Sequence, residues 1–167
     1  MTKNSFRIFM IVTILSFGCQ TSKELQQHYE NQIGDTPFDE AIDNPNFKFC
    51  DSTKVLHKRA YIQYTGGEKA LEEELIKNYT FQSALNNFTG YFIIRFAVNC
   101  NNETGRFRIE VLDSNFKKGH CSKALENHIL SIAKSLKQWN HANYRGKDYD
   151  GYRFINIKMK NGNIIKS

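Results

Sequence analysis

Cysteine and histidine are the residue types with the most chemistry to offer in this chain. Cys100, His120, Cys121 and His128 could supply zinc ligands, or Cys121 and a histidine could pair as nucleophile and base. However, His120 and Cys121 are adjacent, which is a poor chelating spacing, and His128 falls near the apolar stripe of an expected helix. The G-x-S-x-G, H-E-x-x-H, P-loop and G-x-G-x-x-G motifs do not occur. We therefore expect no metal, no cofactor and no enzymatic activity.

The start of the chain has the pattern of a secretory signal peptide. Basic Lys3 and Arg7 accompany an apolar run over residues 6–17, which as a helix would span roughly 18 Å, well short of a hydrocarbon core of about 30 Å. The run ends in LSFGC, which resembles a bacterial lipobox, where the peptide is cut before a cysteine that then carries lipid. The alternative is an ordinary secretory signal with an incidental cysteine. We expect residues 1–18 to be removed and Cys19 to be acylated with a fatty acid such as palmitate.

An oxidising envelope compartment would allow one disulfide among the other cysteines, Cys50, Cys100 and Cys121. Three pairings are then open. We predict Cys50–Cys100, because Cys50 begins the expected domain and Cys100 ends its first central strand, so a bridge would pin the polar lead-in to the sheet. Cys100 and Cys121 flank the same passage from hairpin to helix and form the alternative pair. In the predicted pairing Cys121 is the spare thiol.

The chain divides into a polar lead-in and one folded domain. Residues 19–48 are polar and weakly periodic and contain both prolines, which is typical of a tether. Residues 49–167 have room for a single domain with a real core. Loss of the signal peptide would leave 21 Lys and Arg against 17 Asp and Glu, a net charge of +4 instead of +6. Because basic residues are interspersed with acids, they indicate a solvated surface and argue against nucleic-acid binding.

Hydrophobic periodicity predicts two helices and three long strands in this domain. The first helix is expected over residues 68–78, after two glycines. Alternating apolar residues predict a hairpin of the strands GYFIIRFAV and RFRIEVL around the turn NCNNETG. Ser122 can cap a second helix, whose apolar stripe ends just before Trp139. A last strand, GYRFINIKMK, leads through an asparagine-glycine turn into a stub strand at residues 164–165.

The order of these elements predicts an α+β fold class. Helix, strand, strand, helix, strand allows both helices to cover one face of a small antiparallel sheet of about three strands. Trp139, the single tryptophan, stands at the end of the apolar stripe, where it is best placed to close the gap between helix and sheet. A role as a ligand-stacking platform is the alternative, although the apolar spacing already accounts for this residue.

The succession of GGEKALEEELIKN, GYFIIRFAVNCNNETGRFRIEVL, KSLKQW and YRGKDYDGYRFINIKMKNG resembles the C-terminal domain of TonB and its relatives. That family has a Gly-Gly lead into a helix, two strands joined by a turn, a helix ending in tryptophan, a Gly-Lys turn and a last strand. The resemblance covers residues 60–167. His141 departs from it, because a proline is usual there. The chain also resembles TonB itself neither in a spanning helix nor in a long Pro-rich segment.

The resemblance implies an envelope protein, in the periplasm or at the outer membrane, whose domain binds a protein or peptide partner by strand addition. In the family the partner is an extended segment of an outer-membrane transporter. The lipobox adds a membrane anchor. The alternative is a structural or regulatory lipoprotein that keeps the fold without binding peptide.

The last strand is the expected binding edge, because Arg153, Lys158 and Lys160 give it the charge that protects sheet edges from aggregation. A proline at position 157 is expected to remove a ladder donor and disturb this edge, so that partner capture falls while the other strands persist. The residues expected to bind the partner are Tyr152, Arg153, Phe154, Ile155, Asn156, Ile157 and Lys158.

Overall fold

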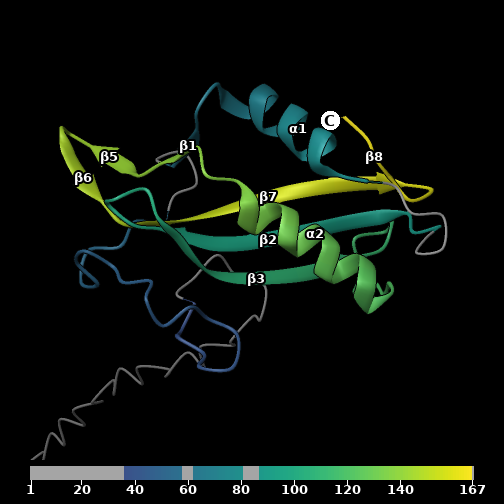
Figure 1. Ribbon diagram of the computed structural model, residues 1–167, viewed down its shortest axis with the longest axis horizontal. Helices are drawn as coiled ribbons and strands as arrows, with labels where there is room; N and C mark the ends of the chain where they lie inside the picture. Colours follow the sequence, from purple (N-terminus) through teal and green to yellow (C-terminus); the bar gives the residue numbers. More distant parts are fainter. Residues whose placement is uncertain (1–35, 58–61, 81–86, 167) are drawn as a thin grey trace, which may run out of the picture. The chain divides into compact units, whose positions relative to one another are not determined.

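The computed structural model describes residues 36–57, 62–80 and 87–166 (Figure 1). The expected signal peptide, Cys19 and part of the expected tether lie outside these ranges. The described residues form a mixed α+β fold, as the periodicity predicts. Their elements are β1 (Gln63–Tyr64), α1 (Gly67–Asn78), β2 (Gly90–Val98), β3 (Thr104–Leu112), α2 (Lys123–Ser135), β4 (Trp139–Asn140), β5 (Ala142–Tyr144), β6 (Lys147–Tyr149), β7 (Gly151–Lys160) and β8 (Asn163–Ile164).

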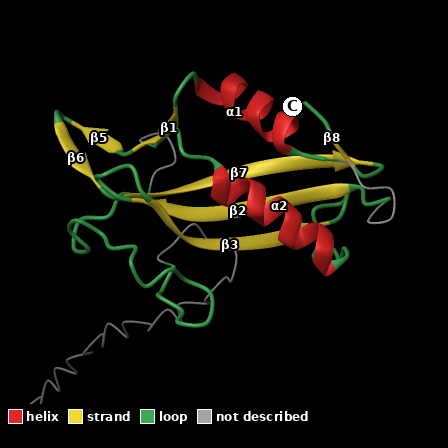
Figure 2. Cartoon of the chain, viewed as in Figure 1, coloured by secondary structure: helices red, strands yellow, loops and turns green. Residues whose placement is uncertain are grey.

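Three long antiparallel strands make the body of the sheet, and a stub strand extends it to the order β3-β2-β7-β8 (Figure 2). β2 lies between β3 and β7 and pairs with β7 from Gly90 opposite Met159 to Val98 opposite Gly151. β8 pairs only with Met159 and Lys160. β8 is the predicted stub strand, at Asn163–Ile164 instead of residues 164–165, and the short pairs β1–β4 and β5–β6 are additional to the prediction.

Both helices pack on one face of this sheet, where their apolar residues and those of the strands form one core. Ser122 caps α2 as predicted, since its hydroxyl accepts a hydrogen bond from the Leu125 amide at 3.2 Å. α1 begins one residue before its expected start. No helix among the described residues is both long and apolar enough to cross a membrane. The core includes Leu71, Leu75, Leu125, Ile129 and Ile132 from the helices, and Phe92, Ile94, Phe96, Ile155, Ile157 and Met159 from the strands.

The asparagine-glycine turn forms the predicted hairpin at the end of β7. Asn161 and Gly162 have φ values of 48° and 75°, and they join Lys160 to its partner Asn163 in β8. Left-handed backbone at both turn positions matches the twist of the flanking strands, and asparagine and glycine adopt it at low cost.

The opposite face of the sheet is partly covered by residues 36–48, which the sequence assigns to the tether. Phe47 is buried there with Ala97 and Tyr152 in a second, smaller apolar cluster. A Cβ on Gly105 would lie 2.3 Å from a ring carbon of Phe47, so the close packing of this ring requires glycine in β3. These contacts extend the folded part of the chain upstream of residue 49.

Asp43 makes a second attachment between this segment and the sheet. Its side chain is only 2% exposed, and both carboxylate oxygens accept hydrogen bonds from the Arg108 guanidinium, at 2.7 and 2.9 Å. These hydrogen bonds hold the pKa of Asp43 below its usual value of 3.8. A carboxyl group with a lowered folded-state pKa stabilises the fold above its unfolded pKa, and this contribution is lost as the pH falls through the folded-state pKa.

We expect Asp43→Asn to lower the free energy of unfolding at neutral pH by roughly 1.5–3 kcal/mol, the usual range for hydrogen bonds to a charged group. Because the substituted amide does not titrate, the variant should also lose less stability than the parent between about pH 4 and pH 2. Denaturant unfolding of both proteins across this range measures the difference. Parallel stability curves would contradict a contribution from Asp43 ionisation.

Candidate functional site

The outer edge of β7 makes backbone contacts with other parts of the chain on both sides of Asn156. At one end the Tyr152 amide donates to the Leu56 carbonyl at 2.9 Å, and at the other the Ile165 amide donates to the Lys158 carbonyl at 3.0 Å. Backbone groups alternate in direction along a strand, so even-numbered residues of β7 present their N–H and C=O to this edge. Asn156 lies between the two contacts, and no described residue forms a backbone hydrogen bond with it on this side. The open position on this edge is therefore Asn156.

The same alternation corrects the prediction for Ile157. As an odd-numbered residue, it directs its amide toward β2, where its partner is Phe92. Its side chain is only 2% exposed. A proline at position 157 would remove a ladder donor, as predicted, but this donor belongs to the β2–β7 ladder inside the sheet, so the substitution would not act on the outer edge alone. Asn156 is the position that tests the edge.

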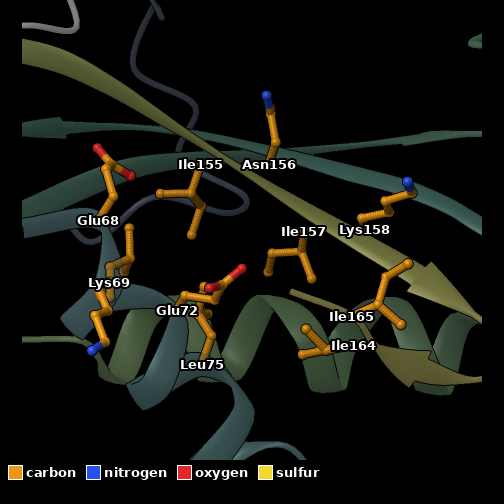
Figure 3. Close-up of a pocket in the computed structure, with 11 residues that line it drawn as sticks. Glu68, Lys69, Glu72, Leu75, Ile155, Asn156, Ile157, Lys158, Ile164 and Ile165 are labelled. Carbon is orange, nitrogen blue, oxygen red and sulfur yellow. The ribbon is translucent and has the colours of Figure 1, made fainter. Parts of the chain in front are cut away.

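A groove of about 480 Å³ runs between α1 and this edge of β7 (Figure 3). Ile155 and Ile157 point from β7 toward α1, and Asn156 points away from it. The four residues Ile155–Lys158 extend about 13 Å at roughly 3.3 Å per residue, so the groove follows β7 for the length of a short extended peptide. Its lining residues are Glu68, Lys69, Leu71, Glu72, Leu75, Ile155, Asn156, Ile157, Lys158, Ile164 and Ile165.

The predicted edge residues divide between the two faces of the sheet. Ile155 and Ile157 belong to the main core under the helices, while Tyr152 belongs to the second cluster on the far face. Phe154 is half-buried, and Asn156 and Lys158 are exposed. Of the seven predicted binding residues, only the last four, Ile155–Lys158, line the groove.

The sequence predicts that Arg153 gives the edge an exposed charge, but this residue is buried. It faces the helices, is 3% exposed, and its guanidinium lies 5.7 Å from the centre of the Trp139 ring. Nη2 donates a short hydrogen bond to Glu68 at the start of α1. A buried guanidinium needs such a partner, because an isolated charge is costly to remove from water. The exposed charges on β7 itself are those of Lys158 and Lys160, and Glu68 and Lys69 of α1 are exposed on the other wall of the groove.

The predicted disulfide between Cys50 and Cys100 is present, with the two Cα atoms 6.1 Å apart. Cys121 is a free, half-buried thiol. Burial and the nearby Glu126 carboxylate raise the pKa of this thiol. The thiolate is the nucleophilic form of cysteine, so the surroundings of Cys121 disfavour the role of nucleophile that the sequence analysis considered for it.

The candidate zinc ligands are not assembled into a site. Within the described ranges, the one group of three His, Cys, Asp or Glu residues whose donor atoms lie within 4.8 Å of one another is Cys50, Cys100 and Asp150. The disulfide already uses both of these sulfurs. His120, Cys121 and His128 form no such group.

The helix wall of the groove was missed by the sequence reasoning. The sequence predicts residues 68–78 only as a helix, yet Glu72 and Leu75 of this helix line the groove. The stub strand was expected, and its neighbour Ile165 contributes the contact that closes one end of the open edge. The sequence signal for this contact was the apolar pair Ile164 and Ile165, which follows the asparagine-glycine turn closely.

No protein-family model, curated protein or solved structure matches the chain. The likeness to the TonB C-terminal domain therefore stays a prediction from the sequence. The fold is described at the level of a mixed α+β domain, and the function is argued from the groove and the strand edge beside it.

Proposed function

We propose that this chain is a lipid-anchored envelope protein whose domain binds an extended segment of a partner protein along the β7 edge. The observation that carries the proposal is the groove beside Asn156, where an outward backbone donor and acceptor border a trough lined by both apolar and charged side chains. A strand added there would continue the hydrogen-bond ladder of the sheet, which is the usual source of affinity in β-augmentation. The resemblance to the TonB C-terminal domain supports the same mode of binding.

The walls of the groove define the kind of segment that fits. Side chains alternate across a strand, so every second residue of the added segment would face α1 and the apolar side chains of Ile155, Ile157 and Leu75. The residues between them would lie on the other face, beside Asn156 and Lys158. We therefore infer an extended segment with apolar residues at alternate positions and polar or acidic residues between them.

Asn156→Pro is expected to lower partner capture about fivefold or more, because it removes one outward backbone donor and one such hydrogen bond contributes about 1 kcal/mol. Proline is tolerated at strand edges, so the fold should persist. A photocrosslinking amino acid at position 69, on an exposed residue of the groove wall, would measure capture in native envelopes. The identity of the crosslinked proteins would name the partner.

Position 73 provides the matched control for this experiment. Glu73 is exposed and lies on the same helix but does not line the groove. Crosslinks from position 69 that are absent from position 73 and weakened by Asn156→Pro would support strand addition. An undiminished yield in the folded proline variant would contradict it. A lack of specific crosslinks from position 69 would favour a structural or regulatory lipoprotein that keeps the fold without binding peptide.

Cys19→Ser is expected to change the processing of the chain and to shift most of it out of the lipid-modified, detergent-soluble fraction. The motivation is LSFGC after a short apolar run. A single acyl chain holds a protein only marginally at a bilayer, so firm anchoring would require several chains on this residue. Metabolic labelling with palmitate and mass spectrometry of the mature N-terminus measure the modification. Identical processing of both chains, without lipid, would overturn the anchor.

A further inference from the structure

Basic and aromatic side chains gather at the end of the sheet where β2 begins and β3 ends. We define the loop patch as Tyr91 of β2, Phe116, Lys117 and Lys118 of the loop between β3 and α2, and Lys158 and Lys160 of β7. The rings of Tyr91 and Phe116 stack with centroids 4.6 Å apart, and Lys158 Nζ lies 5.9 Å from the Tyr91 ring centre. These contacts join the loop to β2 and β7 through Phe116, Tyr91 and Lys158.

Phe116 is the most exposed large apolar residue in the described ranges, at 67%. Its φ of 60° is left-handed, a conformation that is unusual for a bulky side chain. The Asp113 carboxylate holds the loop in shape by accepting hydrogen bonds from the amides of Asn115 and Lys117, at 2.8 and 2.9 Å. The loop therefore presents Phe116 to solvent in a fixed position, which core packing does not explain.

The four lysines of the loop patch are all exposed, and none forms an ion pair with a described residue. Elsewhere on the domain Lys54, Lys77 and Lys123 each pair with an acid three residues away. The acid within the loop, Asp113, directs its carboxylate at the loop amides. The result is a positive surface around an exposed aromatic side chain.

We propose that the loop patch docks on an anionic lipid bilayer, with the lysines among the headgroups and Phe116 inserted toward the acyl chains. Lysines near a membrane surface are attracted by anionic lipids, and an apolar side chain among them adds burial at the boundary. A nucleic acid fits this surface less well, because single-strand binding uses several open ring faces, whereas Phe116 is stacked on Tyr91. A single exposed ring at a loop tip suits insertion into a bilayer.

This docking differs from strand addition and from the proposed lipid anchor, although Lys158 belongs both to the loop patch and to the groove lining. Lys117 and Lys118 do not line the groove beside β7, so changing them tests the loop patch without altering the groove. An anchor at Cys19 would hold the chain at a membrane but would not by itself bring Phe116 into it. Insertion of Phe116 and anchoring through Cys19 therefore need different measurements.

Tryptophan fluorescence of the full chain carrying Phe116→Trp tests the insertion. Trp139 is 1% exposed, so its contribution can be measured in the parent chain and subtracted. We expect a blue shift from position 116 with vesicles of phosphatidylcholine and phosphatidylglycerol, and none with phosphatidylcholine alone. When K117Q/K118Q is introduced into the Phe116→Trp chain, the lipid concentration at the half-maximal shift should rise about tenfold or more. Each lysine near an anionic surface contributes roughly a fivefold increase in affinity.

K137Q/K147Q is the charge-matched control, because Lys137 and Lys147 are exposed and lie outside the loop patch. It should leave the titration unchanged. The apolar N-terminal run is present in every variant and with both vesicle types, so differences report on the loop. The proposal is overturned by no shift with anionic vesicles, by an equal shift with phosphatidylcholine alone, or by equal losses in the two double variants. A response to a single-stranded oligonucleotide without one to vesicles would overturn it in favour of nucleic acid.

Discussion

Trp139→Ala is expected to lower the free energy of unfolding by about 3–5 kcal/mol, the range for removing a large aromatic side chain from a core. The indole is 1% exposed and lies against two other rings. The ring centroid of Tyr64 is 5.0 Å away in an edge-on arrangement, and that of Phe96 is 4.9 Å away. Alanine would leave a cavity between β1, β2 and the start of β7, because three separate elements would have to move to close it.

Trp139→Phe is the matched control for this substitution. It keeps most of the apolar volume, and it removes an indole N–H that is buried without a hydrogen-bond acceptor among the described residues. We therefore expect a loss well below that of alanine, within about 1.5 kcal/mol. Denaturant unfolding followed by far-UV circular dichroism measures both, since the variants lack the only tryptophan. A loss below about 1 kcal/mol for alanine would contradict the role of Trp139 as the plug between helix and sheet.

The long elements could be predicted because each repeats its signal over several residues. α1 was expected over residues 68–78 and spans Gly67–Asn78, and the Ser122 cap of α2 was identified from its type and position. Alternation in GYFIIRFAV placed Phe92, Ile94 and Phe96 on the buried face. Periodicity is informative where many residues report on the same face.

The short strands could not be predicted in the same way. β1 and β4 have two residues each, too few for any alternation, and they pair only because the chain brings Tyr64 opposite Trp139. β5 and β6 are joined by Arg145 and Gly146, both with left-handed φ, where the sequence indicated only a turn. These pairs depend on tertiary contacts that no local pattern records.

The sequence predicts the strand that carries the candidate site, but it does not predict which backbone amides of that strand point outward. Alternation shows which residues share a face, but it does not show toward which neighbouring strand an amide points. That direction depends on the position of β2, so Ile157 was chosen where Asn156 carries the outward donor. The burial of Arg153 did have a signal, because it shares the odd-numbered positions of Ile155 and Ile157, which face the core.

Removing the disulfide by Cys50→Ala with Cys100→Ala is expected to lower the free energy of unfolding by about 2–4 kcal/mol, because the bridge restricts the unfolded chain. The two cysteines are 50 residues apart in the sequence, so the bridge closes a long loop. Cys121→Ala is the control, since this thiol takes no part in the bridge. Non-reducing peptide mapping checks the pairing, and a bridge that contains Cys121 would contradict it.

Asp150 links the chain segments around Cys50 and Cys100 through hydrogen bonds. Its energetic coupling to the disulfide can therefore be measured. Its carboxylate is buried and accepts hydrogen bonds from the amides of Asp51 and Cys100, both at 2.8 Å. Asn in its place would turn an NH₂ group toward one of these donors, at a cost of roughly 1–3 kcal/mol. In the chain without the bridge, Asp150 is a remaining tie between the segments, so Asp150→Asn should cost more there, by about 0.5–3 kcal/mol. The four proteins of this double-mutant cycle measure the coupling, and strictly additive losses would show that the carboxylate and the disulfide stabilise the fold independently.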